Sequence, residues 1–471
     1  MGPEAKGMLA LMRKWRRETE PWYGAMGLAS LVVGTSSILV PLMVAQVLRG
    51  TVENVGIISS LASLMGVVGS LVWGRLSDVA HRRKPFVIMS YTMVAASFAG
   101  IAFAQSLTAI VLLNMMLNLF WVANASVSIL LVIENRDESV WEGKIGHINQ
   151  MVALGWVSGL IFGSVALAVA SPRMGEAAAI RSVFGALAFG GLVAAILAAR
   201  LIPRTRPRFI HRRFRGTILA LGNFIVERAR FAPSHLYHRF NPRRLPALLW
   251  GEGGLKRETK SFLVAMLLAF AAFGFFFVPL PILLADRFGF ASSTVFSYFV
   301  VLNGAIVIAY PLATRRVKRL GNKSVLTGSL LARVLLFALG GASLLAWPVA
   351  PSRLLLSLFF FGIGVSWSFF QLSSVAMISR LAQPEYRGQA LGLYNAVAGL
   401  GTIIAGVTSG LMAQHLGYAA TSFTSAILTV AAMLVVARLP IPRRTTKPVD
   451  DSMTDDEHAS EHMRAQPERS R

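Results

Sequence analysis

The stretch Gly74-Arg75-Leu76-Ser77-Asp78-Val79-Ala80-His81-Arg82-Arg83-Lys84 places one acidic residue among four basic residues, between two long apolar segments. A purely basic counterpart, Ala313-Thr314-Arg315-Arg316-Val317-Lys318-Arg319-Leu320-Gly321-Asn322-Lys323, begins 239 residues later and also lies between apolar segments. We expect both stretches to be short charged loops at the ends of membrane helices. A charged loop that recurs once in this setting indicates a duplicated membrane transporter.

Composition supports a membrane protein. The chain has 471 residues, of which 55% are apolar and only 14% are charged, whereas soluble domains carry about 25% charged residues. Apolar runs of about 20 residues can cross a bilayer, and they must be helices because lipid offers no partner for backbone polar groups. The predicted spans are residues 24–47, 54–74, 86–105, 107–133, 144–170, 180–202, 261–285, 292–313, 324–346, 351–378, 387–414 and 419–438.

The charge pattern fixes an expected orientation. A net charge of +24 would suit a nucleic-acid binder, but the basic residues are unevenly placed among the predicted loops. With a cytoplasmic N-terminus, the short cytoplasmic segments hold 18 Lys and Arg and the external loops hold 5. This bias follows the positive-inside rule and predicts a plasma-membrane protein with both termini in the cytoplasm. The basic surface is expected to contact anionic lipids rather than nucleic acid.

Three motifs that recur in the second half of the sequence indicate a duplication. Val40-Pro41-Leu42 recurs as Val278-Pro279-Leu280, Trp121 as Trp367, and the charged loop as described above, at nearly constant offsets. We therefore predict an all-α integral membrane fold of twelve transmembrane helices in two six-helix pseudo-symmetric bundles. The expected parts are a cytoplasmic N-terminal segment (1–21), two bundles (22–202 and 261–440), a basic linker (203–260) and a disordered tail (441–471). The linker is interpreted equally well as an interfacial helix or as a solvated segment.

Other function classes find little support in the sequence. The chain contains no cysteine, which excludes disulfides and cysteine-based metal or nucleophile chemistry. It has no Gly-x-x-x-x-Gly-Lys-Ser/Thr loop, which disfavours ATP-driven transport. The predicted helices contain no cluster of catalytic groups, so we expect neither an enzyme nor a bound metal or cofactor.

The chain resembles the major facilitator superfamily over roughly residues 20–440. That family's signature between its second and third helices combines a Gly, an Asp and a basic run, which Gly74, Asp78, Arg82, Arg83 and Lys84 match. Val79 and His81 depart from the signature, and the second copy has Val317 where Asp78 would stand.

The resemblance implies a latch. In this reading, Asp78 docks on the start of the eleventh helix, near Gly388, and on a basic residue after the fourth, Arg136, which closes the cytoplasmic side. A carboxylate at a helix C-terminus also needs such a partner, because that end of the helix is already partially negative. The alternative is that these residues only set topology and contact lipid headgroups.

Polar residues on two matching helix faces predict a substrate cavity. Polar groups are costly against lipid, so these faces should point into the bundle or a wet cavity. The resemblance also implies that the first, fourth, seventh and tenth helices line the cavity. The candidate cavity residues are Thr35, Ser37, Asn114, Asn118, Trp121, Ser128, Phe273, Phe276, Trp367, Gln371 and Ser374.

No acidic residue falls at the centre of a predicted span, which weakens the case for a cationic cargo or for proton coupling. Glu134 and His147, near the cytoplasmic face, are the possible proton sites. Arg333 is the most deeply placed charge, and we expect its side chain to snorkel toward the interface.

The sequence predicts a monomeric secondary transporter that moves a small neutral or amphipathic organic solute by alternating access. Efflux of hydrophobic compounds is slightly favoured because the predicted cavity faces combine aromatic rings with few fixed charges. Uptake of a nutrient such as a sugar or organic acid is the first alternative. A non-transporting membrane receptor or scaffold, which recruits a partner through the basic linker, is the second.

Overall fold

A computed structural model describes residues 20–80, 84–133, 141–203, 256–346, 352–382 and 387–440. Residues Met1–Arg438 form one compact unit, and the described part of that unit consists of helices joined by short connections. Its long helices are α2 (Tyr23–Leu42), α3 (Val52–Ala80), α4 (Lys84–Phe103), α5 (Leu107–Ile133), α6 (Trp141–Met174), α7 (Glu176–Leu201), α11 (Arg257–Phe277), α13 (Ser292–Leu320), α14 (Asn322–Ala346), α15 (Arg353–Leu381), α16 (Arg387–Leu416) and α17 (Tyr418–Arg438). The short elements are α12 (Leu280–Ile282) and two π-helices, η1 (Met43–Val47) and η3 (Leu283–Arg287).

The helices have the length and composition of membrane spans. Eleven of them qualify when only the described residues are considered. The remaining long helix is α5, in which the side chains are described continuously only from Leu107 to Ala123. Large apolar side chains lie bare on the outer surface, among them Phe103 (82% exposed) and Phe189 (70% exposed). A water-soluble protein rarely exposes so much apolar surface, so this surface faces lipid.

Backbone details confirm the duplication. The first span contains a proline and ends in the π-helix η1, and the seventh span contains a proline and ends in the π-helix η3. The two π-helices begin 240 residues apart. The residues that follow take matching left-handed conformations, with φ of 53° at Arg49 and 65° at Gly289. Gly175 and Gly417 form a second matched pair, with φ of 81° and 84°. Arginine rarely adopts a positive φ, so the shared geometry rather than residue preference sets this turn.

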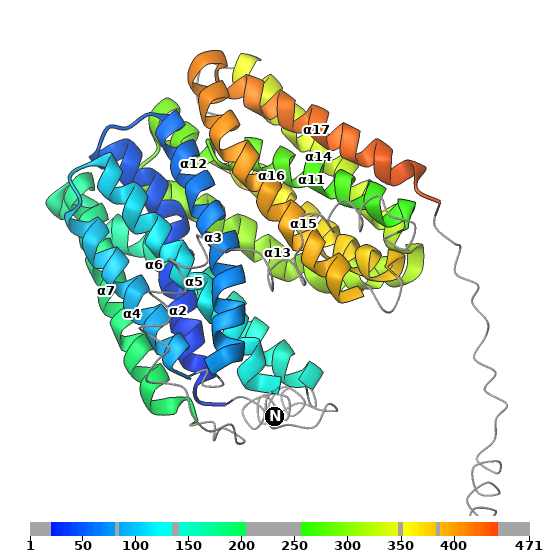
Figure 1. Cartoon of the computed structure of the whole chain (residues 1–471). Coiled ribbons are helices and arrows are strands. Elements are labelled where there is room, and N and C mark those ends of the chain that lie inside the picture. The colour runs from blue at the N-terminus through cyan, green and yellow to red at the C-terminus, as the bar shows by residue number, and fades with distance from the viewer. Residues whose placement is uncertain are drawn as a thin grey trace, which may run out of the picture. The chain divides into compact units, whose positions relative to one another are not determined.

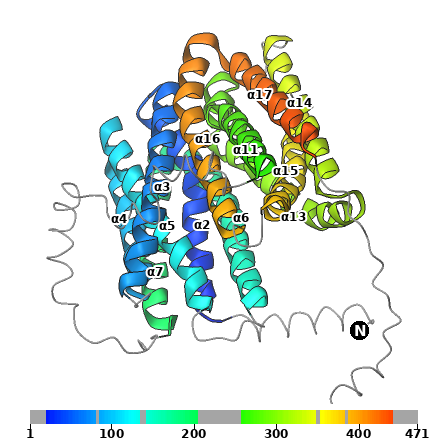
Figure 2. The ribbon, with the colours of Figure 1, turned by 45° about the vertical axis from the view of Figure 1, so that its right-hand side comes forward.

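The two halves repeat one packing pattern. In the first half α2 packs on α6, α3 on α5, and α4 on α7. In the second half the equivalent pairs are α11 with α16, α13 with α15, and α14 with α17. The two most extensive contacts between the halves that the described helices make are α3 with α16 and α6 with α13, and α2 also contacts α12. Figures 1 and 2 both show the ribbons of α3 and α16 side by side.

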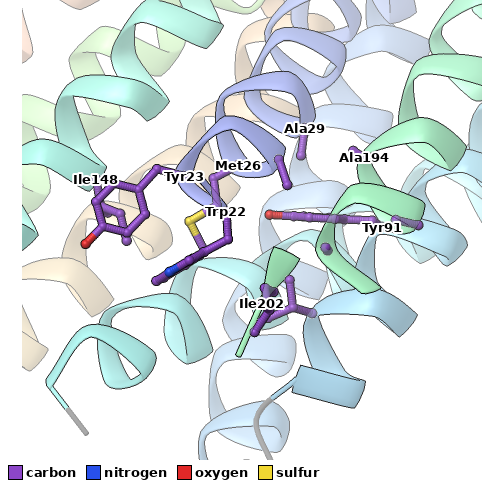
Figure 3. Close-up of a cluster of buried hydrophobic side chains, with 12 residues drawn as sticks. Trp22, Tyr23, Met26, Ala29, Tyr91, Ile148, Ala194 and Ile202 are labelled. Carbon is purple, nitrogen blue, oxygen red and sulfur yellow. The ribbon is translucent and has the colours of Figure 1, made fainter. Parts of the chain in front are cut away.

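A buried apolar cluster holds α2 within the first half. Trp22, Tyr23 and Met26, at the start of α2, belong to one cluster with Ile148 of α6, Tyr91 of α4 and Ile202, which follows α7. Figure 3 shows the Tyr23 ring beside Ile148, with Tyr91 on the opposite side. The rings of Trp22 and Tyr23 meet edge to face with their centroids 4.6 Å apart. Because helices in a membrane associate mainly through close packing, this cluster favours movement of the first half as one body.

Most of each charged segment is helical, which corrects the expectation that both form loops, and residues 81–83 lie outside the described residues. Helix α3 continues through Gly74 and Asp78 to Ala80, and α13 continues to Leu320. Helix α13 stops only at Gly321, which has a φ of 82°. Hydropathy marks where a helix leaves the lipid, whereas backbone geometry decides where it ends, and no residue before Gly321 forces the chain out of the helical conformation.

The described helices begin and end at two sides of the unit, which we call the Gly175 end and the Lys84 end. The Gly175 end contains the turns at Arg49, Gly175, Gly289 and Gly417. The Lys84 end contains the starts of α4 and α14 and the C-terminal ends of α3 and α13.

Candidate functional site: a cavity between the two halves

Glycines allow α3 and α16 to touch across the two halves. A Cβ atom at Gly56 would overlap the carbonyl oxygen of Gly406 and would lie only 3.0 Å from the Cα of Gly410. The Ser60 hydroxyl donates to the carbonyl oxygen of Ile403 at 2.6 Å. Such close backbone approach requires small residues on both helices, which is the usual way that membrane helices associate.

A second contact joins α6 to α13. The Ser164 hydroxyl donates to the Ser293 carbonyl oxygen at 3.0 Å and lies 2.9 Å from the Ser297 hydroxyl. Ser292 donates twice: its backbone N–H to Glu176 Oε1 at 2.9 Å, and its hydroxyl to Gln46 Oε1 at 2.5 Å. Glu176 therefore caps the N-terminus of α13 from the other half of the protein.

The hydrogen bonds between the halves that are named above lie in the helix portions nearer the Gly175 end. We call the contacts of α3 with α16 and of α6 with α13 at this end the Gly175-end interface. This interface holds the two halves together on one side of the membrane.

Glu176→Ala is expected to weaken this interface. A carboxylate at a helix N-terminus stabilises by up to about 1 kcal/mol, so its loss should raise the population of molecules open at the Gly175 end about fivefold. Because the chain has no native cysteine, spin labels at Gln105→Cys and Gln414→Cys, both exposed near this end, can report the opening by pulsed electron spin resonance. Glu53→Ala, in the first turn of α3 at the same end, is the control, and an equal change in both variants would contradict the prediction.

A cavity of about 700 Å³ lies between the halves, on the Lys84 side of the Gly175-end interface. Its wall is mostly apolar and aromatic, with a few hydroxyl and amide groups. Arg333 is the one charged residue among its described lining residues. The residues that line it are Ser37, Ile38, Pro41, Ser59, Ser63, Trp156, Leu160, Phe270, Phe273, Gly274, Phe277, Val278, Pro281, Phe299, Leu302, Asn303, Ile306, Arg333, Ile363, Trp367, Ala398, Gly399 and Thr402.

A smaller cavity of about 300 Å³ adjoins it within the first half. Asn114, Asn118 and Trp121 of α5 form its polar wall, and the Asn118 amide donates to the Asn114 carbonyl oxygen at 2.9 Å. The two cavities share Ser37, Pro41, Ser59 and Trp156 as lining residues.

Six predicted cavity residues lie on these walls. Ser37, Phe273 and Trp367 line the central cavity, whereas Asn114, Asn118 and Trp121 line the smaller one. Ser128 belongs to α5, but its side chain is outside the described residues.

Four other predicted cavity residues are not among the described residues that line either cavity. The Thr35 hydroxyl donates to the Gly159 carbonyl oxygen at 2.7 Å and thereby joins α2 to α6. Ser374 is buried and lies 2.8 Å from the Tyr394 hydroxyl, and Gln371, three residues earlier on α15, has a buried Oε1 without a partner. Phe276 stacks on Phe337 with the ring centroids 4.6 Å apart and lines a separate apolar pocket.

The predicted gating residues are only partly described. Gly74, Asp78 and Gly388 lie in helices whose side chains are not described at those positions, as does the possible proton site His147. Arg82, Arg83, Arg136 and Glu134 lie outside the described residues. Lys84 donates to the Ile202 carbonyl oxygen at 2.7 Å, so it ties the start of α4 to the end of α7 within the first half.

Arg333 was not predicted to line the cavity, and the expectation that it snorkels is wrong. Its side chain is fully buried at the middle of α14. The guanidinium carbon lies 4.2 Å from the centre of the Phe273 ring and 5.1 Å from that of Trp367. The sequence did contain a signal for this position, which is a charged residue in the middle of a predicted span. Such residues commonly mark substrate pathways.

The contacts of Arg333 offset only part of the free-energy cost of burying its charge. Nη2 donates weakly to the Ile363 carbonyl oxygen at 3.4 Å, whereas Nε and Nη1 are buried without a partner. Removing a charge from water costs several kcal/mol, and a cation–π contact returns about 0.5–2 kcal/mol. Protein stability alone therefore gives little reason to keep an arginine here.

Comparisons with known proteins agree with this architecture. The family model of the Major Facilitator Superfamily matches residues 23–337 and 304–467, whereas a search of curated proteins finds no match. Similar solved structures include the nucleoside transporter NupG (14% identity, TM-score 0.63, 89% of this chain and 98% of that one). Others are a D-xylose–proton symporter (13%, 0.65, 90% and 98%) and the human organic anion transporter MFSD10 (17%, 0.57, 90% and 99%).

Two six-helix halves around a central cavity define a multi-pass membrane transporter of the secondary type. The chain belongs to the Major Facilitator Superfamily. It is therefore a transporter rather than an enzyme.

Proposed function

We propose that the protein moves a small amphipathic organic solute through the central cavity by alternating access. The observation that carries the proposal is a cavity of about 700 Å³, lined by both halves and placed below the interface that joins them. This volume suits a drug-sized solute. Rocking of one half against the other would expose such a cavity to each side of the membrane in turn. In this proposal residues 22–202 and 261–440 are the moving bodies, and residues 203–260 are the linker.

The proposed orientation places the Lys84 end in the cytoplasm. Its support is the positive-inside rule together with the exposed basic side chains of Arg315, Arg316, Lys318 and Arg319 near the end of α13. In that orientation the Gly175-end interface would be the external gate, and the basic end would meet the anionic lipids of the inner leaflet.

The cargo is proposed to be an amphipathic compound that is exported. Aromatic side chains such as Phe270, Phe273 and Trp367 supply apolar contact area, and Asn303 and Thr402 supply hydrogen-bonding groups. The named relatives carry nucleosides, a sugar or organic anions, so the shared fold does not select the cargo.

A transport screen in proteoliposomes tests this proposal. The panel would contain sugars, organic acids and hydrophobic drugs, each measured with and without a pH gradient. Accumulation of a hydrophobic compound supports the proposal, and accumulation of a sugar alone would favour nutrient uptake. Absence of all transport by folded protein would favour the receptor alternative. Gradient-dependent transport would be repeated with Glu134→Gln and His147→Asn, which remove the two possible proton sites.

Asp78→Asn is expected to leave the protein inserted and folded but to slow transport about tenfold. Asp78 lies in the last turn of α3, where a carboxylate faces the negative end of its own helix. The proposed latch would place it on the N-terminus of α16 and on a nearby cation, contacts that together stabilise by about 1–2 kcal/mol. Glu258→Gln, in the first turn of α11, is the matched control. Full transport activity of Asp78→Asn would contradict the latch and would favour the alternative, in which residues 74–84 only set the membrane topology.

A further inference from the structure

We propose that Arg333 is the binding residue for an anionic group on the cargo, so that the transported solute is an organic anion with an apolar or aromatic body. This inference rests on the proposed transport function and names its substrate class. It narrows the sequence-based expectation of a neutral or amphipathic solute to an amphipathic anion, because the one charge on the described cavity wall is positive.

The first step of the argument is the position of Arg333. Helix α14 runs from Asn322 to Ala346, which puts Arg333 roughly 16–20 Å from either end of the helix at a rise of 1.5 Å per residue. This is the depth at which transporters of this architecture bind their cargo. Arg333 also lines the central cavity, whereas the basic residues near the ends of α13 lie outside it.

The second step is unused hydrogen-bonding capacity. Arginine has five N–H donors, of which the Nε and Nη1 groups hold three. Both nitrogens are buried without an acceptor, and the structure gives Arg333 no carboxylate partner among the described residues. Guanidinium groups bind carboxylates through two parallel hydrogen bonds, and the edge formed by Nε and an Nη atom is the usual place for such a pair.

The third step is the aromatic surroundings. The guanidinium carbon lies within 6.0 Å of four ring centres, those of Phe273, Trp367, Phe337 and Phe370. Phe273 and Trp367 also line the cavity and lie edge to face, with their ring centres 5.6 Å apart. These two rings contact the guanidinium, share the cavity wall with Arg333, and offer apolar contact area to the body of a solute.

The fourth step concerns access. Arg333 has no exposed surface in this arrangement, so an entering anion has to displace a ring that covers it. Trp367 and Phe273 are the candidates, because both contact the guanidinium and both line the cavity. Binding of the anion would then exchange cation–π contacts for charge-assisted hydrogen bonds, which are the stronger interaction.

The test compares naphthoate, an anion at neutral pH, with naphthamide, its neutral amide of nearly the same shape. Binding is measured on the purified full-length protein as ligand-induced thermal stabilisation, and uptake is measured in proteoliposomes. The variants are Arg333→Gln and Arg333→Lys. Arg287→Gln is the control, because Arg287, like Arg333, donates to a backbone carbonyl oxygen, that of Leu344 at 3.0 Å, but is not among the described residues that line the cavity.

We expect the wild type and Arg287→Gln to prefer naphthoate over naphthamide. Arg333→Gln should lose this preference through a drop of about tenfold or more in naphthoate affinity, the effect of losing a hydrogen bond to a charged group. Arg333→Lys should keep part of the preference, since lysine retains the charge but not the paired donors. Unchanged preference in folded Arg333→Gln, or no preference in the wild type, would overturn the inference.

The two proposals can fail separately. Transport of naphthamide or another neutral compound without preference for the anion would leave the transport function standing and overturn the role of Arg333. Arginine-dependent binding of naphthoate with no uptake of any compound would overturn the transport function and leave the anion site standing. The wild-type comparison decides the anion preference even when Arg333→Gln does not fold.

Discussion

Gly56→Leu is expected to stop transport while leaving the protein folded. Gly56 faces Gly406 and Gly410 across the two halves, and a Cβ alone would already overlap the Gly406 carbonyl oxygen. Overpacking of a tight contact costs up to about 3 kcal/mol, which would lower the population closed at the Gly175 end by up to about a hundredfold. A transporter that cannot close on one side cannot complete the alternating-access cycle.

The measurement combines transport with distances between the halves. Spin labels at Gln105→Cys and Gln414→Cys should move apart in Gly56→Leu, and Gly56→Ala should give a smaller effect in the same direction. Gly66→Ala, on the same helix, is the matched control for the alanine variant, because its Cβ would make only ordinary contact with Val122 at 3.7 Å. A Gly56→Leu protein that transports at the wild-type rate would show that the Gly175-end interface does not close during turnover.

Gly159→Leu is expected to destabilise the fold rather than to trap one state. Gly159 lies on α6 against α2, where a Cβ would overlap the Leu31 carbonyl oxygen and lie 3.0 Å from the Thr35 backbone nitrogen. The Thr35 hydroxyl also donates to the Gly159 carbonyl oxygen. This contact lies within one half, which moves as a rigid body in the proposed cycle, so no state of that cycle would relieve the overlap. We expect a loss of about 1–3 kcal/mol or more of stability.

Monodispersity on size-exclusion chromatography and the midpoint of thermal unfolding would report this loss. Gly185→Leu in α7 is the control, since a Cβ there meets nothing within 4 Å. If Gly159→Leu folds and unfolds at the wild-type temperature, then the contact between α2 and α6 is looser than the structure indicates. Together with Gly56→Leu, this variant separates contacts that define a half from contacts that the cycle must break.

The membrane spans were largely predictable because lipid imposes a strong compositional rule on each helix separately. The repeat was also predictable, because short motifs such as Val40-Pro41-Leu42 persist where the backbone must bend in the same way twice. Helix ends were less predictable, as the extension of α3 to Ala80 shows. The charges near its end leave the lipid without disturbing the helical backbone.

The candidate cavity was only partly predictable, since a polar side chain in a helix has two uses. Asn114 and Trp121 line a cavity, whereas the hydroxyl of Thr35 is used between two helices. Spacing along one helix identifies a shared face, but the neighbouring helices decide whether that face meets a cavity or another backbone.

The sequence by itself determined the membrane class, the number of spans, the duplication and the family resemblance, because each depends on local composition or on short motifs. Only the tertiary structure decided which face of α14 turns inward, and hence that Arg333 lies buried among aromatic rings at the cavity wall. The same holds for the glycine contacts at Gly56 and Gly159. Burial, close approach and missing hydrogen-bond partners arise between helices far apart in the chain, and no pattern within a single helix specifies them.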